Sequence, residues 1–113
     1  MEEKNTNMKK VFKYPLKYKN VNTFLGSGAS WEKQQIIELP AYSEVLHVNK
    51  QGNELMLWAR VNPHTDFEHK VGIEIVGTGH DIKGDGKYVN TFFDGGLVMH
   101  VFVDYGMYTN EKV

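Results

Sequence analysis

Cysteine is absent from this chain of 113 residues, and its absence excludes several kinds of chemistry. Without cysteine there is no disulfide, no thiolate nucleophile and no zinc site built on sulfur. The sequence also lacks an apolar run of about 20 residues, the length that a membrane-spanning helix needs. The N-terminus is too polar for a secretory signal. Together these features predict a cytoplasmic protein.

The signatures of familiar catalytic and cofactor sites are missing as well. No Walker loop, dinucleotide fingerprint or nucleophile elbow is present, and the five histidines show neither HxH nor HExxH spacing. The segment Asp81–Gly86 resembles a calcium loop only faintly, because Lys83 and Phe92 stand where such a loop needs acidic ligands. We therefore predict a non-enzymatic protein with no cofactor and no metal.

The chain has little net charge, −1 in total, which argues against a dedicated binder of duplex DNA. The charge is nevertheless uneven. Six lysines against two glutamates give Met1–Lys19 a charge of +4, and seven basic against twelve acidic residues give the remainder −5. Such a lysine run is typical either of a segment that meets an anionic partner or of a solvated tail with a lysine-protected edge strand.

What is present indicates one soluble β domain. Hydrophobic residues make up 41% and charged residues 24%, an ordinary globular composition, and the length suits one domain. We predict a flexible tail over residues 1–9, a single domain over 10–105 and a second tail over 106–113. The fold class is all-β or β-dominated: a small antiparallel barrel or sandwich of six or seven strands, with at most one short helix.

The clearest local structure is a hairpin over Glu44–Val61. A two-residue turn at Gly52-Asn53, with glycine first as in a type II′ turn, pairs Val48 with Leu57 and Leu46 with Ala59. In this register one face is apolar and the other is mixed. The residues expected on the apolar face are Leu46, Val48, Leu55, Leu57, Ala59 and Val61. Those expected on the mixed face are His47, Asn49, Met56, Trp58 and Arg60.

Other strands are indicated by alternating or β-branched runs. They are Lys10–Tyr14 at a sheet edge, Trp31–Leu39, Val71–Val76, Tyr88–Phe93 and Leu97–Tyr105. The segment Trp31–Leu39 also suits a short helix, but its two adjacent isoleucines and the proline that follows favour a strand. Asp94-Gly95-Gly96 is expected to be a tight turn that joins the last two strands. Lys19–Ser30, rich in asparagine, glycine and serine, is expected to be a loop.

The strongest candidate site is the loop that carries Gly77, Thr78, Gly79 and His80. Glycines let a backbone approach a ligand closely, and exposed N–H groups can hold an anion. We predict that this loop shares a pocket with Trp58 or His100, within one chain or across a subunit interface, and that His47 belongs to the same ligand-binding site. The simpler alternative is that the glycines only supply a turn after a strand. The histidines are in that case packed or hydrogen-bonded residues of the sheet.

Six aromatic residues are candidates for stacking on a base or for anchoring a protein partner. They are Trp31, Tyr42, Trp58, Tyr88, Tyr105 and Tyr108. The alternative for each one is that it fills a small β core. Trp58 is singled out because the hairpin register puts it on the mixed face.

Several sequence blocks in order resemble a family of small bacteriophage and prophage proteins. The blocks are KYPL (13–16), IIELP (36–40), LHV (46–48), LWA (57–59), IVGTGH (75–80) and GGLVMHVF (95–102). The resemblance covers roughly Val11 to Val103, and its last two blocks are the more specific ones. It implies a phage or prophage setting and a location in the host cytoplasm. It carries no activity, but small phage proteins often bind and disable a host component.

These observations lead to three hypotheses of different classes. The first is a non-enzymatic, homo-oligomeric binding protein that acts on a host or defence component, with a nucleotide-like immune signal as one possible ligand. The second is a structural or accessory phage protein that binds only protein. The third is a small hydrolase in which His80 or His100 acts as acid or base beside Asp81 or Asp94. A concave aromatic site, an exposed apolar patch or a pair of titratable groups in contact would distinguish them.

Overall fold

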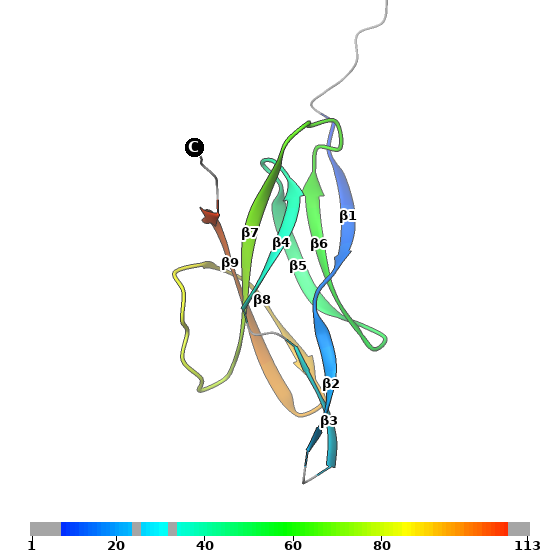
Figure 1. Ribbon diagram of the computed structural model, residues 1–113, viewed down its shortest axis with the longest axis vertical. Coiled ribbons are helices and arrows are strands. Elements are labelled where there is room, and N and C mark those ends of the chain that lie inside the picture. Colours follow the sequence, from blue (N-terminus) through cyan, green and yellow to red (C-terminus); the bar gives the residue numbers. More distant parts are fainter. Residues whose placement is uncertain (1–7, 24–25, 32–33, 109–113) are drawn as a thin grey trace, which may run out of the picture.

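The computed structural model describes residues 8–23, 26–31 and 34–108. Within these ranges the chain forms nine strands and no helix. Seven strands make two antiparallel sheets that pack face to face, and the other two form a separate ribbon (Figure 1). The sheets do not close into a barrel. The predicted all-β class is confirmed, and of its two architectures the sandwich is the one that forms.

The first sheet has three strands in the order β1-β6-β5, and the second has four in the order β4-β7-β9-β8. The strands of the first sheet are β1 (Lys10–Pro15), β5 (Glu44–Gln51) and β6 (Glu54–Val61). Those of the second are β4 (Gln34–Pro40), β7 (Glu68–Gly77), β8 (Lys87–Asp94) and β9 (Leu97–Tyr108). The predicted edge position of the first strand is confirmed, because among the described strands β1 pairs with β6 alone.

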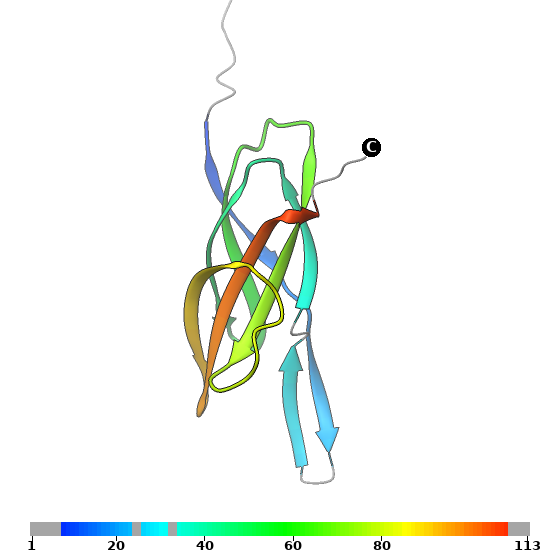
Figure 2. The same cartoon turned by 90° about the vertical axis from the view of Figure 1, so that its left-hand side faces the viewer.

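The prediction of a loop over Lys19–Ser30 is wrong, because the backbone of this segment forms a two-stranded ribbon. Strands β2 (Tyr18–Thr23) and β3 (Gly26–Trp31) pair antiparallel from Tyr18↔Trp31 to Thr23↔Gly26. The ribbon extends away from the sandwich, as Figure 2 shows. Glycine and serine are weak strand formers, so the composition of this segment did not predict strands. The pairing forms nevertheless, because a ladder needs only backbone N–H and C=O groups.

The β5–β6 hairpin confirms the predicted turn and half of the predicted register. Gln51 pairs with Glu54, so Gly52-Asn53 is the two-residue turn, and Val48 pairs with Leu57 as expected. The pairing of Leu46 with Ala59 is wrong, because a bulge between Val45 and His47 shifts the strand. Val45 therefore faces Ala59 and is buried, while Leu46 is 38% exposed. A bulge adds one residue and reverses the inward and outward positions beyond it.

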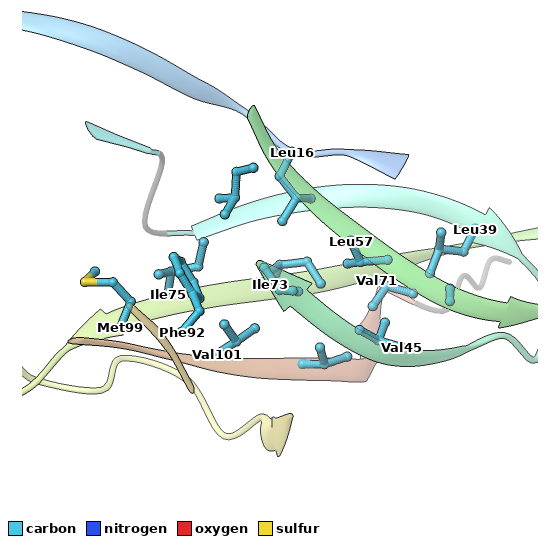
Figure 3. Packing of buried hydrophobic residues seen from close by; sticks show 14 of the residues in the cluster. Leu16, Leu39, Val45, Leu57, Val71, Ile73, Ile75, Phe92, Met99 and Val101 are labelled. Atoms are coloured by element: carbon cyan, nitrogen blue, oxygen red, sulfur yellow. The ribbon is translucent and has the colours of Figure 1, made fainter. Parts of the chain in front are cut away.

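The core lies between the two sheets and is formed mainly by inward-facing aliphatic side chains, with Phe92 and Met99 among its members (Figure 3). Fully buried members include Leu55, Leu57 and Val61 from the first sheet and Leu39, Ile73, Ile75, Val101 and Val103 from the second. Alternation along β5 and β6 supplies one half of this core, whereas β7 is buried along most of its length. Because β7 and β9 are the inner strands of the larger sheet, they hold the segments that carry the candidate site residues.

Two side-chain amides join backbone segments at opposite edges of the sandwich, one between the sheets and one between β4 and the segment that follows β1. Asn90 on β8 donates to the Val48 carbonyl at 2.8 Å and accepts the Val48 N–H at 2.9 Å. On the other side, Gln35 of β4 accepts the Lys17 N–H at 2.8 Å and donates to its carbonyl at 3.2 Å. Each amide thus pairs with one backbone residue as a neighbouring strand would. These bonds hold the edges together without barrel closure.

Two crossings between the sheets lie side by side. One is the turn from β4 to β5, and the other is the segment 62–67 from β6 to β7. The Ala41 N–H donates to the Phe67 carbonyl at 2.8 Å and so joins them. At the end of the chain, β9 runs to Tyr108, beyond the expected boundary at Tyr105. The strand therefore continues into the segment 106–108, for which a tail is predicted.

Candidate functional site

The predicted loop begins where β7 ends, and its two glycines have separate structural roles. The His80 N–H donates to the Gly77 carbonyl at 3.0 Å, and the His80 ring folds back over Gly77. A Cβ at Gly77 would lie 3.2 Å from His80 Nδ1, so a larger residue there must displace the ring. Gly79 has a φ of +88°, which favours glycine. Both glycines therefore have roles within the turn itself.

Glu74, which the sequence analysis did not single out, fastens the next part of this loop. Its carboxylate accepts the Lys83 N–H at 2.7 Å and the Gly84 N–H at 3.0 Å. Glu74 lies on the outer face of β7, between the inward-facing Ile73 and Ile75, yet it is only 8% exposed because the loop covers it. A cavity of about 370 Å³ lies under the loop and is lined in part by Gly79, His80 and Glu74.

His100 joins Thr78 in a chain of polar contacts on the outer face of the larger sheet. Its Nε2 lies 2.8 Å from Thr78 Oγ1, and its Nδ1 lies 3.0 Å from Thr91 Oγ1. Thr91 Oγ1 in turn lies 2.7 Å from the Tyr88 hydroxyl. The structure thus brings the loop and His100 together through Thr78. Both ring nitrogens of His100 contact hydroxyl groups, so its partners here are not carboxylates.

Within one copy of the chain, His47 and Trp58 lie apart from this group, so a pocket that they share with the loop stays a prediction. The two residues are paired on β5 and β6, with ring centroids 6.0 Å apart. They point outward from the three-stranded sheet, whereas His100 and the loop lie on the outer face of the four-stranded sheet. The whole core separates the two outer faces. The expected mixed face of the hairpin is present, but it is a different surface from that of the loop.

A third place gathers three of the six aromatic candidates around one cavity. Tyr42, Tyr88 and Tyr105 line a cavity of about 600 Å³ between the β4–β5 turn and the β8–β9 side of the sandwich. Val45, His69 and Lys87 are among its other lining residues. We call this the tyrosine cavity. Of the remaining candidates, Trp58 lies on the other sheet, and the side chains of Trp31 and Tyr108 fall outside the described part of the chain.

Each tyrosine of the cavity is held by a contact of its own. The Tyr105 hydroxyl accepts the Val45 N–H at 2.8 Å, and burial raises the pKa of this hydroxyl, with the nearby Glu44 adding to the effect. Tyr88 contacts Thr91 through its hydroxyl and Phe102 edge-on, at 5.9 Å between ring centroids. Tyr42 meets the His69 ring at 5.5 Å. The Tyr88 ring therefore lies against Phe102 on the outer face of the larger sheet. Tyr105 is held through its hydroxyl, and the exposed Tyr42 ring has one edge contact.

The charges around the tyrosine cavity favour an anionic ligand. Lys87 and His69 line it, and the single carboxylate in the lining, Glu44, forms an ion pair with Arg60. That pair leaves the Lys87 ammonium as the unneutralised charge of the lining. The cavity therefore combines aromatic surfaces with one cation, a combination suited to a planar ring that carries negative charge.

Sequence reasoning missed this cavity because its parts are far apart in the chain. The three tyrosines come from the β4–β5 turn, from β8 and from β9. Their convergence depends on which strand pairs with which, and no local pattern reports that. The only available signal was the presence of each aromatic residue in or beside an expected strand or turn.

Two general features of the described residues bear on the choice of function. None of these residues belongs to a group of three or more His, Cys, Asp or Glu side chains that could hold a metal ion. Nor does this part of the chain contain a helix that is long and apolar enough to cross a membrane.

Comparison with known proteins places the chain in a family. The family model described as "Domain of unknown function (DUF7352)" matches residues 8–111, which is nearly the whole sequence. The chain therefore belongs to this family. Searches of the curated proteins and of the solved structures give no match.

Proposed function

We propose that this protein is a non-enzymatic binding protein that holds a small, planar, anionic ligand of the nucleotide type in the tyrosine cavity. The observation that carries the proposal is the convergence of Tyr42, Tyr88 and Tyr105 on one cavity beside Lys87. The hydroxyl groups of Tyr105 and Tyr88 each make a hydrogen bond, which reduces the side-chain entropy that these two residues lose on binding.

The size and chemistry of the cavity support a ligand of this class. Its volume of about 600 Å³ lies within the range typical of small-molecule sites. Stacking of a base on an aromatic side chain contributes about 1–3 kcal/mol, and tolerates different bases because each has a π-face. The Lys87 ammonium supplies the attraction for a phosphate or another acidic group.

The biological setting is part of the same proposal. Its support is the resemblance of the sequence blocks, IVGTGH and GGLVMHVF above all, to small phage and prophage proteins. In that setting a protein that only binds a nucleotide-like molecule acts by sequestering it, for example as a signal of host defence. Such a role needs tight binding and no chemical step.

A hydrolase is the second candidate, and one contact favours it. Thr78 Oγ1 lies 2.8 Å from His100 Nε2, which is the distance of a hydroxyl nucleophile from its base. However, the other ring nitrogen of His100 meets the Thr91 hydroxyl, which cannot stabilise a charged imidazole as a carboxylate does. Loss of nucleotide or ester hydrolysis in a His100→Gln variant, measured with purified parent as reference, would favour this candidate.

The direct test is titration calorimetry with a panel of mono-, di- and cyclic nucleotides, preceded by thermal-shift screening. A ligand at 100 times its dissociation constant stabilises the protein by about 2.7 kcal/mol. For the nucleotide that binds, we expect Tyr88→Ala to weaken affinity by the 1–3 kcal/mol of a stacked base, and Tyr88→Phe to retain it. Lys87→Gln should weaken binding and reduce its salt dependence.

The matched control is Phe93→Ala. Phe93 is an exposed aromatic residue on the same strand, β8, but it does not line the tyrosine cavity. It should bind the nucleotide as the parent does. If no nucleotide binds, or if Tyr88→Ala and Phe93→Ala behave alike, the proposal is wrong and a protein that binds only protein becomes the better hypothesis.

A further inference from the structure

A second hollow, whose lining also includes Tyr42, lies where the two crossings between the sheets meet. It has a volume of about 510 Å³ and is lined by Glu38, Ala41, Tyr42, Phe67, Glu68, His69 and Lys70. We call it the crossover groove. Tyr42 and Phe67 come from the two crossings that the Ala41–Phe67 backbone hydrogen bond joins.

Tyr42 holds an unfavourable backbone conformation without gaining burial. It has a φ of 65°, and no other non-glycine residue in the described part of the chain has a positive φ. The side chain is 87% exposed, so core packing does not offset this cost. An exposed aromatic ring kept where glycine would be relaxed is a sign that the ring itself has a contact to make.

Phe67, on the neighbouring crossing, is a second exposed aromatic residue, with 71% of its surface accessible, and its backbone is not strained. Around the two rings lie the exposed carboxylates Glu38 and Glu68, and neither forms an ion pair within the described ranges. Lys70 and His69 also line the groove, so its carboxylates are only partly balanced. Aromatic faces beside free carboxylates suit cationic side chains with apolar neighbours.

This chain carries a surface of that chemistry. Strand β1 is an edge strand, and Lys9 and Lys10 at its start are exposed and form no ion pair among the residues described. Val11 and Phe12 next to them are also exposed. The charge of the sequence is +4 over Met1–Lys19 and −5 over the remainder, so the N-terminal segment and the rest of the chain attract each other.

We propose that the crossover groove is an interface between copies of this chain, and that it receives the lysine-rich start of β1 from a second copy. Lys9 and Lys10 of that copy would approach Glu38 and Glu68, while its exposed apolar side chains contact Tyr42 and Phe67. A contact between different patches of the same chain closes into a dimer when it is made twice around a two-fold axis. The inference does not depend on nucleotide binding, because Phe67, Glu38 and Glu68 do not line the tyrosine cavity.

The decisive experiment is a charge exchange followed by analytical ultracentrifugation at low and high salt. One variant carries Lys9→Glu and Lys10→Glu, and the other carries Glu38→Lys and Glu68→Lys. We expect the parent to associate at low salt and each variant alone to associate about tenfold or more weakly, because like charges then face each other. An equimolar mixture of the two variants should associate as the parent does, since opposite charges meet again at both contacts.

The aromatic part is tested by Tyr42→Gly and Phe67→Ser, which should each weaken self-association. Tyr42→Phe should preserve it, and Phe93→Ala, which removes an exposed ring elsewhere, should leave it unchanged. A parent that stays monomeric at low salt at all concentrations would overturn the inference. So would two single-sign variants that fail to associate when mixed although both are folded by circular dichroism.

Discussion

Two turns of this sandwich adopt nearly the same backbone angle with opposite kinds of residue. Gly52, in the β5–β6 hairpin, has a φ of 64°, and Tyr42, in the turn from β4 to β5, has a φ of 65°. Glycine adopts this conformation freely, whereas a side chain with a Cβ is penalised by about 1–2 kcal/mol. The Tyr42 turn is closed by the Ser43 N–H and hydroxyl, both of which donate to the Pro40 carbonyl.

The Gly52 turn serves only the fold, whereas the Tyr42 turn also presents a side chain to the solvent. At Gly52 the local preference, the hairpin register and the core agree with one another, as they do in most of a well-folded sequence. At Tyr42 the local preference is violated, and the ring lines both the tyrosine cavity and the crossover groove. Violations of this kind are expected at functional sites.

The largest loss of stability is expected in the β5–β6 hairpin, where local preference, register and core packing agree. Leu57 is fully buried at the centre of the hairpin face, so Leu57→Ala should lower the free energy of unfolding by about 2–5 kcal/mol. Urea denaturation followed by tryptophan fluorescence measures this change. The matched control is Leu46→Ala, which should cost less than about 1 kcal/mol because the bulge exposes Leu46. Equal losses in the two variants would contradict the observed register.

That pair of residues also shows what the sequence could and could not predict. Alternation and the Gly-Asn turn located the hairpin, its turn and the burial of Leu57. The same alternation put Leu46 in the core, since nothing in the residues around Val45 announces a bulge. A bulge is selected by how the strand meets the opposite sheet, which is a property of the tertiary structure.

The candidate site divides in the same way. The glycine-rich loop was identified from composition. A pocket shared with Trp58 or His100 was expected, whereas the structure shows a contact of Thr78 with His100, which the sequence did not indicate. Trp58 was assigned to the correct face of its hairpin, but sequence alone did not say which sheet the loop belongs to, and within one copy of the chain the two lie apart. Tyr42 was one of six aromatic candidates, but its backbone conformation carried no signal, since a positive φ at tyrosine contradicts the preferences on which such predictions rest.

A smaller loss of stability is expected at the edge of the sandwich, where the Asn90 amide makes the backbone hydrogen bonds that a neighbouring strand would make. Asn90→Ala leaves the Val48 N–H and carbonyl without their amide partner, so the free energy of unfolding should fall by about 1–3 kcal/mol. Hydrogen exchange should show faster exchange at the Val48 amide in particular. Asn49→Ala, on the neighbouring residue, is the control and should leave that amide unchanged. Unaltered protection of Val48 in Asn90→Ala would mean that β5 holds its edge without β8.

The regular turn gives the next prediction. Gly52→Ala should cost about 1 kcal/mol, because alanine is strained at a φ of 64° although the space around that Cβ is open. Gly96→Ala is the matched control, since Gly96 also has open space but no positive φ. It should be close to neutral or slightly stabilising. The difference between the two variants in thermal unfolding isolates the contribution of the backbone angle.

The smallest effect, and the one of opposite sign, is expected at Tyr42. Tyr42→Gly removes about 1–2 kcal/mol of backbone strain, while the added freedom of glycine in the unfolded chain takes back about 0.4–1 kcal/mol. The edge contact with His69 is lost as well, so the net gain in unfolding free energy should be at most about 1 kcal/mol. Tyr42→Ala keeps the strain and loses the ring, and it should be less stable than Tyr42→Gly by the strain energy less that entropy term, on the order of 1 kcal/mol. If Tyr42→Gly is instead more than about 1 kcal/mol less stable than the parent, the ring supports the turn. Its exposure would then not require a ligand or a second copy to explain it.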